Sequence, residues 1–220
     1  MEWEYCHLGD FAMTIQDAID RLRERTQVPL FVGEIWDREL DERLRHARTE
    51  ELFAGLTLRD PQMAACVVAG LHIWNDNFHA SHNLCQGIRT NTGSYWHGID
   101  HRREGHQGEG LRSNLANARY WLRNVGDHPA FDIVYRSALS VLDSTGSGFH
   151  WATEAADQLR ARGKWDPFLL IDWFGQADAR ALPAQCEEIL AEIQWREIDL
   201  LVDWCLQQAV ANLTSRPEPG

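Results

Sequence analysis

The chain has 220 residues, of which 44% are hydrophobic and 25% are charged, and these proportions are ordinary for a globular protein with one sizeable core. The formal net charge is −12 and no long cluster of Lys and Arg occurs, which argues against nucleic acid and anionic membrane surfaces as partners. No stretch approaches the roughly 18 consecutive apolar residues of a transmembrane helix, so no transmembrane helix is expected.

The N-terminal sequence and the cysteines favour a cytoplasmic location. MEWEYCHLGDF is acidic and lacks the basic and apolar segments of a secretory signal. The five cysteines are widely spaced and contain no CxxC pair, so we expect neither a disulfide framework nor a cysteine-based zinc site. Cys66, Cys186 and Cys205 lie among apolar residues at helical spacing, which is typical of small core residues.

Helix signals recur along the chain, whereas strand signals are nearly absent. Capping residues, first-turn prolines and terminal glycines place the helix boundaries. The expected helices cover about 14–26, 37–55, 61–87, 94–104, 113–124, 128–144, 150–162, a segment from 167 and 183–213. We therefore predict an all-α fold, a single-domain bundle of roughly seven to nine helices over residues 1–213, with 214–220 as a frayed tail.

A stripe of uncharged polar side chains follows the helix predicted over 61–87. Its members recur at steps of three and four residues and therefore project from one side of a helix: His72, Asn75, His79, His82 and Gln86. A solvent-facing stripe would more usually hold Glu, Lys and Arg. The composition favours a polar pocket between two buried faces, and a partly exposed polar face is the alternative.

The next predicted helix carries the strongest candidate for a metal site. His97 and His101 are four residues apart, a spacing that lets two imidazoles reach one metal ion, and Glu104 follows one turn later. Two histidines and one carboxylate hold iron or zinc in many open sites. His82 of the preceding helix is the first candidate to complete or orient the set, and His79 is the second. A metal-free polar pocket and a solvated helix face are the alternatives.

Further polar residues near this motif are candidates for substrate contacts. They are Asn75, Asp76, His79, Gln86, Arg102, Arg103 and Tyr120. An arginine could hold a carboxylate or phosphate through two parallel hydrogen bonds. Adjacent arginines on a helix point about 100° apart, so we expect only one of the pair to enter a pocket. Surface ion pairs are the alternative for both.

Four strings resemble an uncharacterised family of bacterial and fungal proteins. They are WNDxxxxSHxxxQ from Trp74, GSYWHGIxHRRE from Gly93, NAxYW from Asn117 and VGxHPxF from Val125. The resemblance implies no known activity. It implies that one recurrent pattern contains Asn75, Asp76, Ser81, His82, Gln86, His97, His101, Arg102, Arg103 and Glu104. His79 departs from the pattern, which has an acidic residue there, and the loop after Glu104 is longer.

These features favour an enzyme acting on a small molecule. The expected catalytic residues, and the expected ligands if one divalent metal ion such as Fe or Zn is bound, are His82, His97, His101 and Glu104. A bound metal could serve hydrolysis or dioxygen chemistry, and without it a histidine would be the general base, oriented by Glu104 or Asp76. The alternative is a non-catalytic protein, monomer or homodimer, that binds a small ligand or a protein partner. Convergence of the three histidines on one point would favour the enzyme.

Overall fold

A computed structural model describes residues 13–26, 28–145, 149–179 and 182–212. Within these ranges the protein is all-α and has no strand apart from an isolated bridge between Leu58 and Val210. The helices are α1 (Ile15–Arg23), α2 (Arg38–His46), α3 (Thr49–Leu52), α4 (Pro61–Trp74), α5 (Phe78–Gly87), α6 (Asn91–Glu104), α7 (Leu111–Leu122), α8 (Phe131–Ser144), α9 (His150–Arg162), α10 (Pro167–Asp178) and α11 (Gln185–Ala209). The predicted all-α class is confirmed, but the predicted number of helices is too low. The expected frayed tail, 214–220, and the N-terminal segment lie outside the described residues.

Two helices that the sequence predicted as continuous are each divided. The segment 37–55 forms α2 and α3, separated at Ala47, whose backbone is extended. The segment 61–87 forms α4 and α5, separated at residues 75–77. These two divisions account for the larger number of helices.

The break between α4 and α5 is built from polar side chains. Asp76 has φ +64°, a left-handed conformation that ends α4 and that Asp tolerates better than most residues. Asn77 then caps α5, because its Oδ1 accepts from the amide of Ala80 at 3.0 Å. Asn75 bonds both backbone groups of Asp37, which fixes the start of α2 against the break. The predicted five-residue polar stripe is therefore not continuous.

His72 lies on the α4 side of this break and is 3% exposed. Its Nδ1 is 3.6 Å from the carboxylate of Asp41 on α2, and Asn77 donates to the same carboxylate at 2.6 Å. Burial lowers the pKa of His72 to about 4, although Asp41 opposes this. His72 thus connects α4 with α2, away from the other histidines of the predicted stripe.

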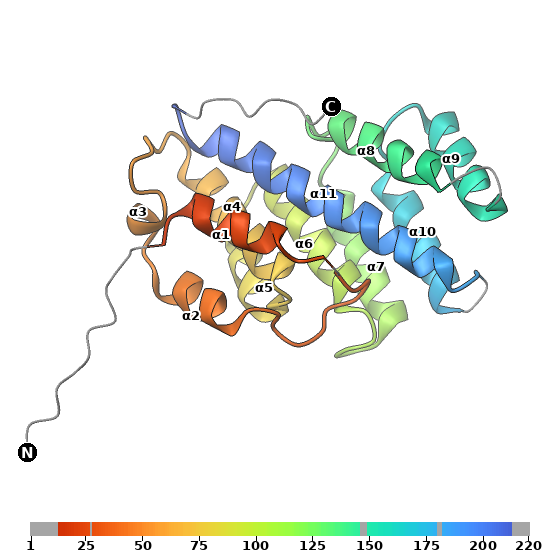
Figure 1. The fold of residues 1–220 in the computed structure, drawn as a ribbon, viewed down its shortest axis with the longest axis horizontal. Coiled ribbons are helices and arrows are strands. Elements are labelled where there is room, and N and C mark those ends of the chain that lie inside the picture. Colours follow the sequence, from red (N-terminus) through yellow and green to blue (C-terminus); the bar gives the residue numbers. More distant parts are fainter. Residues whose placement is uncertain (1–12, 27, 146–148, 180–181, 213–220) are drawn as a thin grey trace, which may run out of the picture.

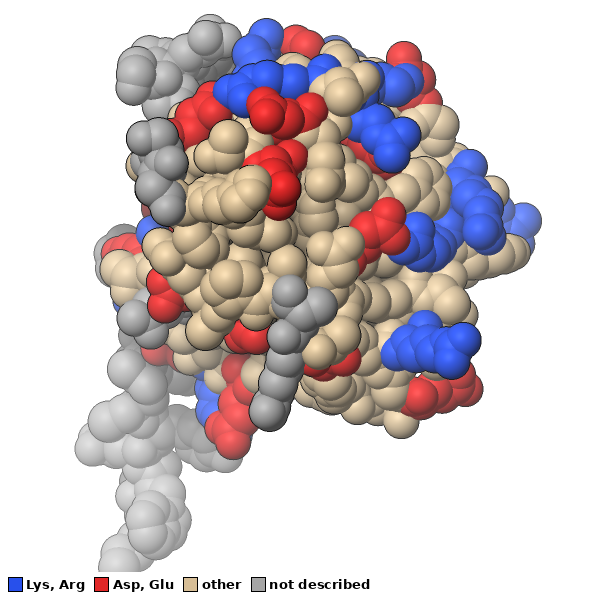
Figure 2. Space-filling view, turned by 90° about the vertical axis from the view of Figure 1, so that its right-hand side faces the viewer, with Lys and Arg blue, Asp and Glu red and all other residues tan. Residues whose placement is uncertain are grey.

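The long helix α11 lies across α4 and beside α8 and α10, and it closes the core (Figure 1). Its apolar stripe is buried as the period of 3.6 predicts, from Cys186 to Cys205. Cys66 and Cys85 are also buried, so the four described cysteines are core residues. No helix in the described ranges is long and apolar enough to cross a membrane. Figure 2 shows one face, on which basic and acidic side chains are interspersed around an uncharged centre.

His128 of the VGxHPxF string is a buried neutral imidazole. Its Nδ1 accepts from the amide of Ala130 at 3.1 Å, so the ring proton resides on Nε2 and is donated to Thr92 Oγ1 at 3.0 Å. A second proton on Nδ1 would face the Ala130 N–H. Burial lowers the pKa of His128 from 6.5 to about 4. The imidazole of His128 therefore resists protonation in the folded protein.

We expect the free energy of unfolding to fall as the pH decreases from 6.5 to 4. In this window the unfolded chain binds a proton at His128 that the folded protein does not, so stability rises with pH at up to about 1.4 kcal/mol per pH unit. Urea unfolding at several pH values measures the slope. The His128→Gln variant, which retains His72, should have a smaller slope, and an equal slope in both proteins would contradict this assignment.

Candidate metal centre

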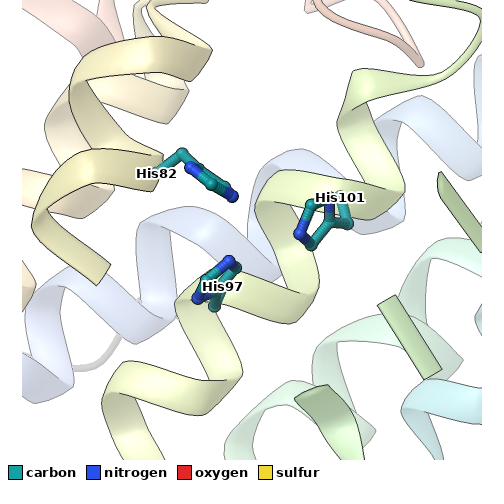
Figure 3. A group of neighbouring side chains, drawn as sticks. All are labelled: His82, His97 and His101. Atoms are coloured by element: carbon teal, nitrogen blue, oxygen red, sulfur yellow. The ribbon is translucent and has the colours of Figure 1, made fainter. Parts of the chain in front are cut away.

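Three histidines from two consecutive helices meet at one point. His82 comes from α5, and His97 and His101 come from α6, where they are one turn apart. Each offers one ring nitrogen, and these three atoms lie within 4.8 Å of one another. Figure 3 shows the imidazoles directed toward a common space between the helices. The convergence that would favour an enzyme is therefore present.

The local sequence explains how α6 presents its two histidines. The helix begins earlier than predicted, because Thr90 rather than Ser94 is its cap and accepts from the amide of Gly93 at 3.0 Å. The rings of His97 and His101 stack with centroids 5.0 Å apart. The His82 ring stands edge-on to both, with centroids at 4.5 Å from His97 and 5.0 Å from His101.

Two of the three imidazoles have a hydrogen-bond partner that fixes the ring. His101 Nδ1 lies 2.9 Å from Glu104 Oε2, so the Nδ1 proton is donated to the carboxylate and Nε2 keeps a free lone pair. His82 Nδ1 lies 2.9 Å from the side-chain amide of Gln86. The amide nitrogen of Gln86 donates to this Nδ1, so the proton of the neutral His82 ring lies on Nε2. Such outer partners are usual for metal-binding histidines.

His97 is held in a different way. Its ring stacks on the indole of Trp121 in α7, with centroids 3.8 Å apart and planes at 13°. Gly98 allows this close approach, because a Cβ there would lie 2.7 Å from the side chain of Leu122. Among the described residues no group forms a hydrogen bond to the buried Nδ1 of His97. A neutral imidazole with an unsatisfied buried nitrogen is a suitable metal ligand.

The site lowers the pKa values of two of its three histidines, His82 and His97. Burial lowers the pKa of His97 to about 3, and the proximity of His82 and His101 lowers it further. The pKa of His82 is also lowered, first by burial and then by His101 and His79. Neutral imidazole is the form that binds metal, so these two rings carry no second proton that a metal would have to displace at neutral pH.

The helix face with these residues is not solvated, which excludes one of the alternatives for the α6 motif. His97 is 2% exposed, and the side chains of His101 and Glu104 are 12% and 14% exposed. The α5 and α7 helices both pack on α6 and cover this face from two sides. The α6 helix is buried on nearly all sides. Its polar residues therefore face other helices and not solvent.

Glu104 does not join the group of ligand atoms. The sequence placed it among the four ligands, but in the structure its carboxylate is engaged with His101 Nδ1. Its position matches the orienting role that was expected for a metal-free site. The same geometry serves a metal site, in which the carboxylate raises the basicity of the ligand.

Several predicted substrate residues are occupied by structural contacts. Asp76 is buried and accepts from Arg103 and, at 2.6 Å, from Arg25. Arg102 points instead to α11, where it pairs with Glu197. Both adjacent arginines are thus 0% exposed, contrary to the expectation that only one enters the interior. Asn75 is held by Asp37. These four side chains support the fold around the site.

Three other predicted substrate residues have accessible side chains. His79 and Gln86 are exposed on α5, and Tyr120 on α7 is 57% exposed. Their role in substrate binding stays a prediction. The ring of Tyr120 stands edge-on to that of Trp121, with centroids 5.5 Å apart.

Sequence reasoning missed a buried polar cluster on α11. Glu197 accepts from Tyr95 at 2.7 Å, from Trp165 at 3.2 Å and from Arg102, and Gln194 bonds Arg102 and the backbone of Leu30. The signal was available, because both polar residues interrupt the apolar stripe of the helix at buried positions.

Asp100 is a second buried group that sequence reasoning left unassigned. It is 0% exposed, accepts from Ser81 at 2.7 Å, and has one carboxylate oxygen without a partner among the described residues. Burial raises the pKa of Asp100 to about 8, against the effect of Ser81. The hydrogen bond between Ser81 and Asp100 joins α5 to α6, and each of these residues precedes a histidine of the cluster in the sequence.

Two cavities stand out, and neither is lined by the three histidines. One of about 980 Å³ lies between the segment from Arg23 to Leu30 and the first half of α11. The other, of about 400 Å³, lies near Phe131 and Trp165.

Comparisons with protein families, with curated proteins and with solved structures found no match to this chain.

Proposed function

We propose that the protein is a metal-dependent enzyme that holds one divalent transition metal ion through His82, His97 and His101 and hydrolyses a small molecule. The observation that carries the proposal is the convergence of the three ring nitrogens within 4.8 Å of one another. Because each nitrogen would lie about 2.0–2.1 Å from a central ion, any two of them that are near the 4.8 Å limit would move closer together on binding.

The energetics of the apo site support this proposal. Three imidazoles in contact cannot share positive charge, and the buried Nδ1 of His97 has no partner among the described residues. A buried polar group without a partner costs about 1–3 kcal/mol. A cation bound between the three rings would be attracted by the lone pair that each ring offers.

The ligand set favours an open, catalytic type of centre. Structural zinc sites usually have four protein ligands, whereas catalytic sites have three and keep a position for water or substrate. Because the carboxylate of Glu104 is engaged with His101, three imidazoles remain as ligands, which suits zinc better than the two-histidine, one-carboxylate pattern of iron oxygenases. A divalent ion held there would act as a Lewis acid and make water a nucleophile at neutral pH.

The surrounding residues would complete the chemistry. Glu104 orients His101 through Nδ1, which leaves Nε2 of His101 as the nitrogen available to an ion, and Gln86 holds the ring of His82. His79 is exposed beside His82, where an imidazole can carry protons between the site and bulk water. Trp121 covers His97 and keeps water from that side of the ring.

Metal loading of the full chain tests the proposal. After chelation, the protein should take up one equivalent of Zn²⁺ or Co²⁺, and the Co²⁺ form should show the strong visible absorption of a tetrahedral site. The Zn²⁺ form should hydrolyse 4-nitrophenyl acetate faster than the apoprotein. Failure to take up Zn²⁺, Co²⁺ or another divalent transition metal would overturn the proposal. Uptake without hydrolysis of this or other activated esters would favour the non-catalytic alternative.

A further inference from the structure

The smaller of the two cavities lies where four helices begin or end. The α7 helix ends at Leu122, α8 begins at Phe131, α9 ends at Arg162 and α10 begins at Pro167. These four residues all line the cavity, whose volume is about 400 Å³. Sites for small organic molecules typically measure about 300–1,000 Å³, so this space is large enough for one. None of the three clustered histidines lines it.

Most of the side chains that line this cavity are apolar. They are Leu122, Phe131, Trp165, Pro167 and Phe168. Trp165 is only 1% exposed, and its indole Nε1 donates to Tyr95 at 2.9 Å and to Glu197 at 3.2 Å. These two hydrogen bonds anchor the indole in the core. An apolar wall of this kind is what the hydrophobic part of a ligand requires.

The VGxHPxF string, which has no part in the proposed metal centre, contributes to the same cavity. Gly126 and Phe131 belong to this string and both line the space. Gly126 has φ +66°, and a Cβ there would meet no atom within 4 Å. The backbone conformation, and not crowding, therefore favours glycine at this position. The string thus forms part of the boundary of an open space.

Two basic side chains line the cavity, and each takes part in a surface ion pair. Lys164 Nζ lies 2.9 Å from Asp127, in a pair whose side chains are 63% and 81% exposed. Arg162 Nε lies 3.3 Å from Oδ2 of Asp166. Asp166 is also the cap of α10, because its Oδ1 accepts from the amide of Phe168 at 3.0 Å. Exposed ion pairs contribute little to stability, so an incoming anion can replace these partners at small cost.

We propose that this cavity is a second ligand site, separate from the metal centre, that binds a small carboxylate with an apolar body. The carboxylate lies between Lys164 and Arg162, and the apolar body lies against Trp165 and Phe168. Charge-assisted hydrogen bonds to the two cations orient the ligand, and burial of its apolar surface adds affinity.

Three related probes test this inference on the full chain after chelation, so that no carboxylate can bind through a metal ion. 3-Phenylpropanoate has both proposed features, 3-phenylpropanamide lacks the charge, and propanoate lacks the ring. Isothermal titration calorimetry measures the affinity of each. We expect 3-phenylpropanoate to bind about tenfold more tightly than the amide, because it forms two partly exposed ion pairs. It should exceed propanoate by at least about tenfold, because its ring is buried.

Charge variants assign the carboxylate to this cavity. Lys164→Gln and Arg162→Gln should each weaken 3-phenylpropanoate by about threefold or more and leave the amide unaffected, since each removes one ion pair. Both side chains are exposed, so the helical circular dichroism should not change. Arg136→Gln is the matched control, because it removes the same charge from an exposed pair with Asp132 on α8. It should retain the affinity of the unaltered protein.

The single lysine of the chain provides an independent readout. Because Lys164 is the only lysine, acylation by N-hydroxysuccinimidyl acetate reports on this side chain once peptide mapping has separated it from the N-terminal amine. Bound 3-phenylpropanoate should slow the reaction in proportion to its occupancy, whereas the amide should not. An unchanged rate in the presence of bound 3-phenylpropanoate would place the probe elsewhere.

The remaining outcomes each decide one part of the inference. No saturable binding of 3-phenylpropanoate up to about 10 mM, the range expected for a probe of this size, would overturn the site. Equal affinity for the acid and the amide would overturn the preference for an anion. Binding that survives both charge variants would overturn the assignment to this cavity. Metal uptake is measured separately, so each of these failures leaves the proposed metal centre standing.

Discussion

The His97→Ala/His101→Ala double variant is expected to lose specific metal binding. Each substitution removes one of three ligand nitrogens, which leaves His82 alone on α5. Loss of an outer-shell partner typically weakens metal affinity about 10–100-fold, and removal of two ligands should exceed that. Elemental analysis after loading, together with titration of Co²⁺ by visible absorption, measures the loss.

Two further variants test whether the loss of metal binding is specific to the proposed ligands. His79→Ala is the matched control, because it removes an exposed imidazole from the same turn of α5 without touching the cluster, and it should keep one equivalent of metal. Glu104→Gln keeps a hydrogen bond to His101 but removes the carboxylate, so we expect about a tenfold weaker affinity. Unchanged metal content in the double variant, with its helical circular dichroism intact, would show that the ligands lie elsewhere.

Replacing Asp76 with asparagine is expected to destabilise the protein by about 3–5 kcal/mol, because it breaks a buried ion pair by removing one partner. Arg103 is 0% exposed, and burial already lowers its pKa to about 10 even though Asp76 opposes the shift. The Nε and Nη1 atoms of Arg103 have no partner within the described ranges, so Asp76 provides its countercharge. Asparagine tolerates the left-handed backbone, which isolates the effect of the charge.

Urea unfolding of Asp76→Asn measures this loss against a surface control. Glu39→Gln removes the partner of Arg43, an exposed pair four residues apart on α2 that should contribute only about 0.3–0.5 kcal/mol. If Asp76→Asn cost no more than Glu39→Gln, the ion pairs of Asp76 could not be what holds the break between α4 and α5.

The all-α class was predictable because helix signals are local. Asp60 caps α4 ahead of a first-turn proline, Asp166 does the same for α10, and the apolar stripe of α11 shows a period of 3.6 over many turns. Each signal depends on residues within a few positions of one another. The same locality explains why the spacing of His97 and His101 could be interpreted as a metal motif before their surroundings were known.

The break inside 61–87 was not predictable in this way. Asp76 adopts its left-handed conformation in a setting where its carboxylate meets Arg25, which is distant in the sequence, and Arg103. The helix propensities of the residues at the break indicate only a polar segment that could continue a helix. The predicted stripe from His72 to Gln86 was therefore assembled from two helices.

The burial of α6 was the other feature that the sequence did not reveal. The hydrophobic residues of α6 do not form one stripe, since polar residues lie between them. These polar residues can be buried because they bond to polar partners on other helices. Arg102 needs Glu197 of α11, and Asp100 needs Ser81 of α5. Pairings of this kind depend on the packing of whole helices, so one sequence could not distinguish an inward arginine from a surface one.

The three proposed ligands all belong to the α5–α6 hairpin, from His82 to His101. Closing so short a loop costs little chain entropy, and contacts of low sequence separation form early in folding. The hairpin would then be able to bind metal before α11 packs on the core. The bound ion would stabilise the hairpin while the rest of the chain is still unfolded. The centre could in this way act as a folding nucleus, and refolding with and without Zn²⁺ should differ in rate as well as in end point.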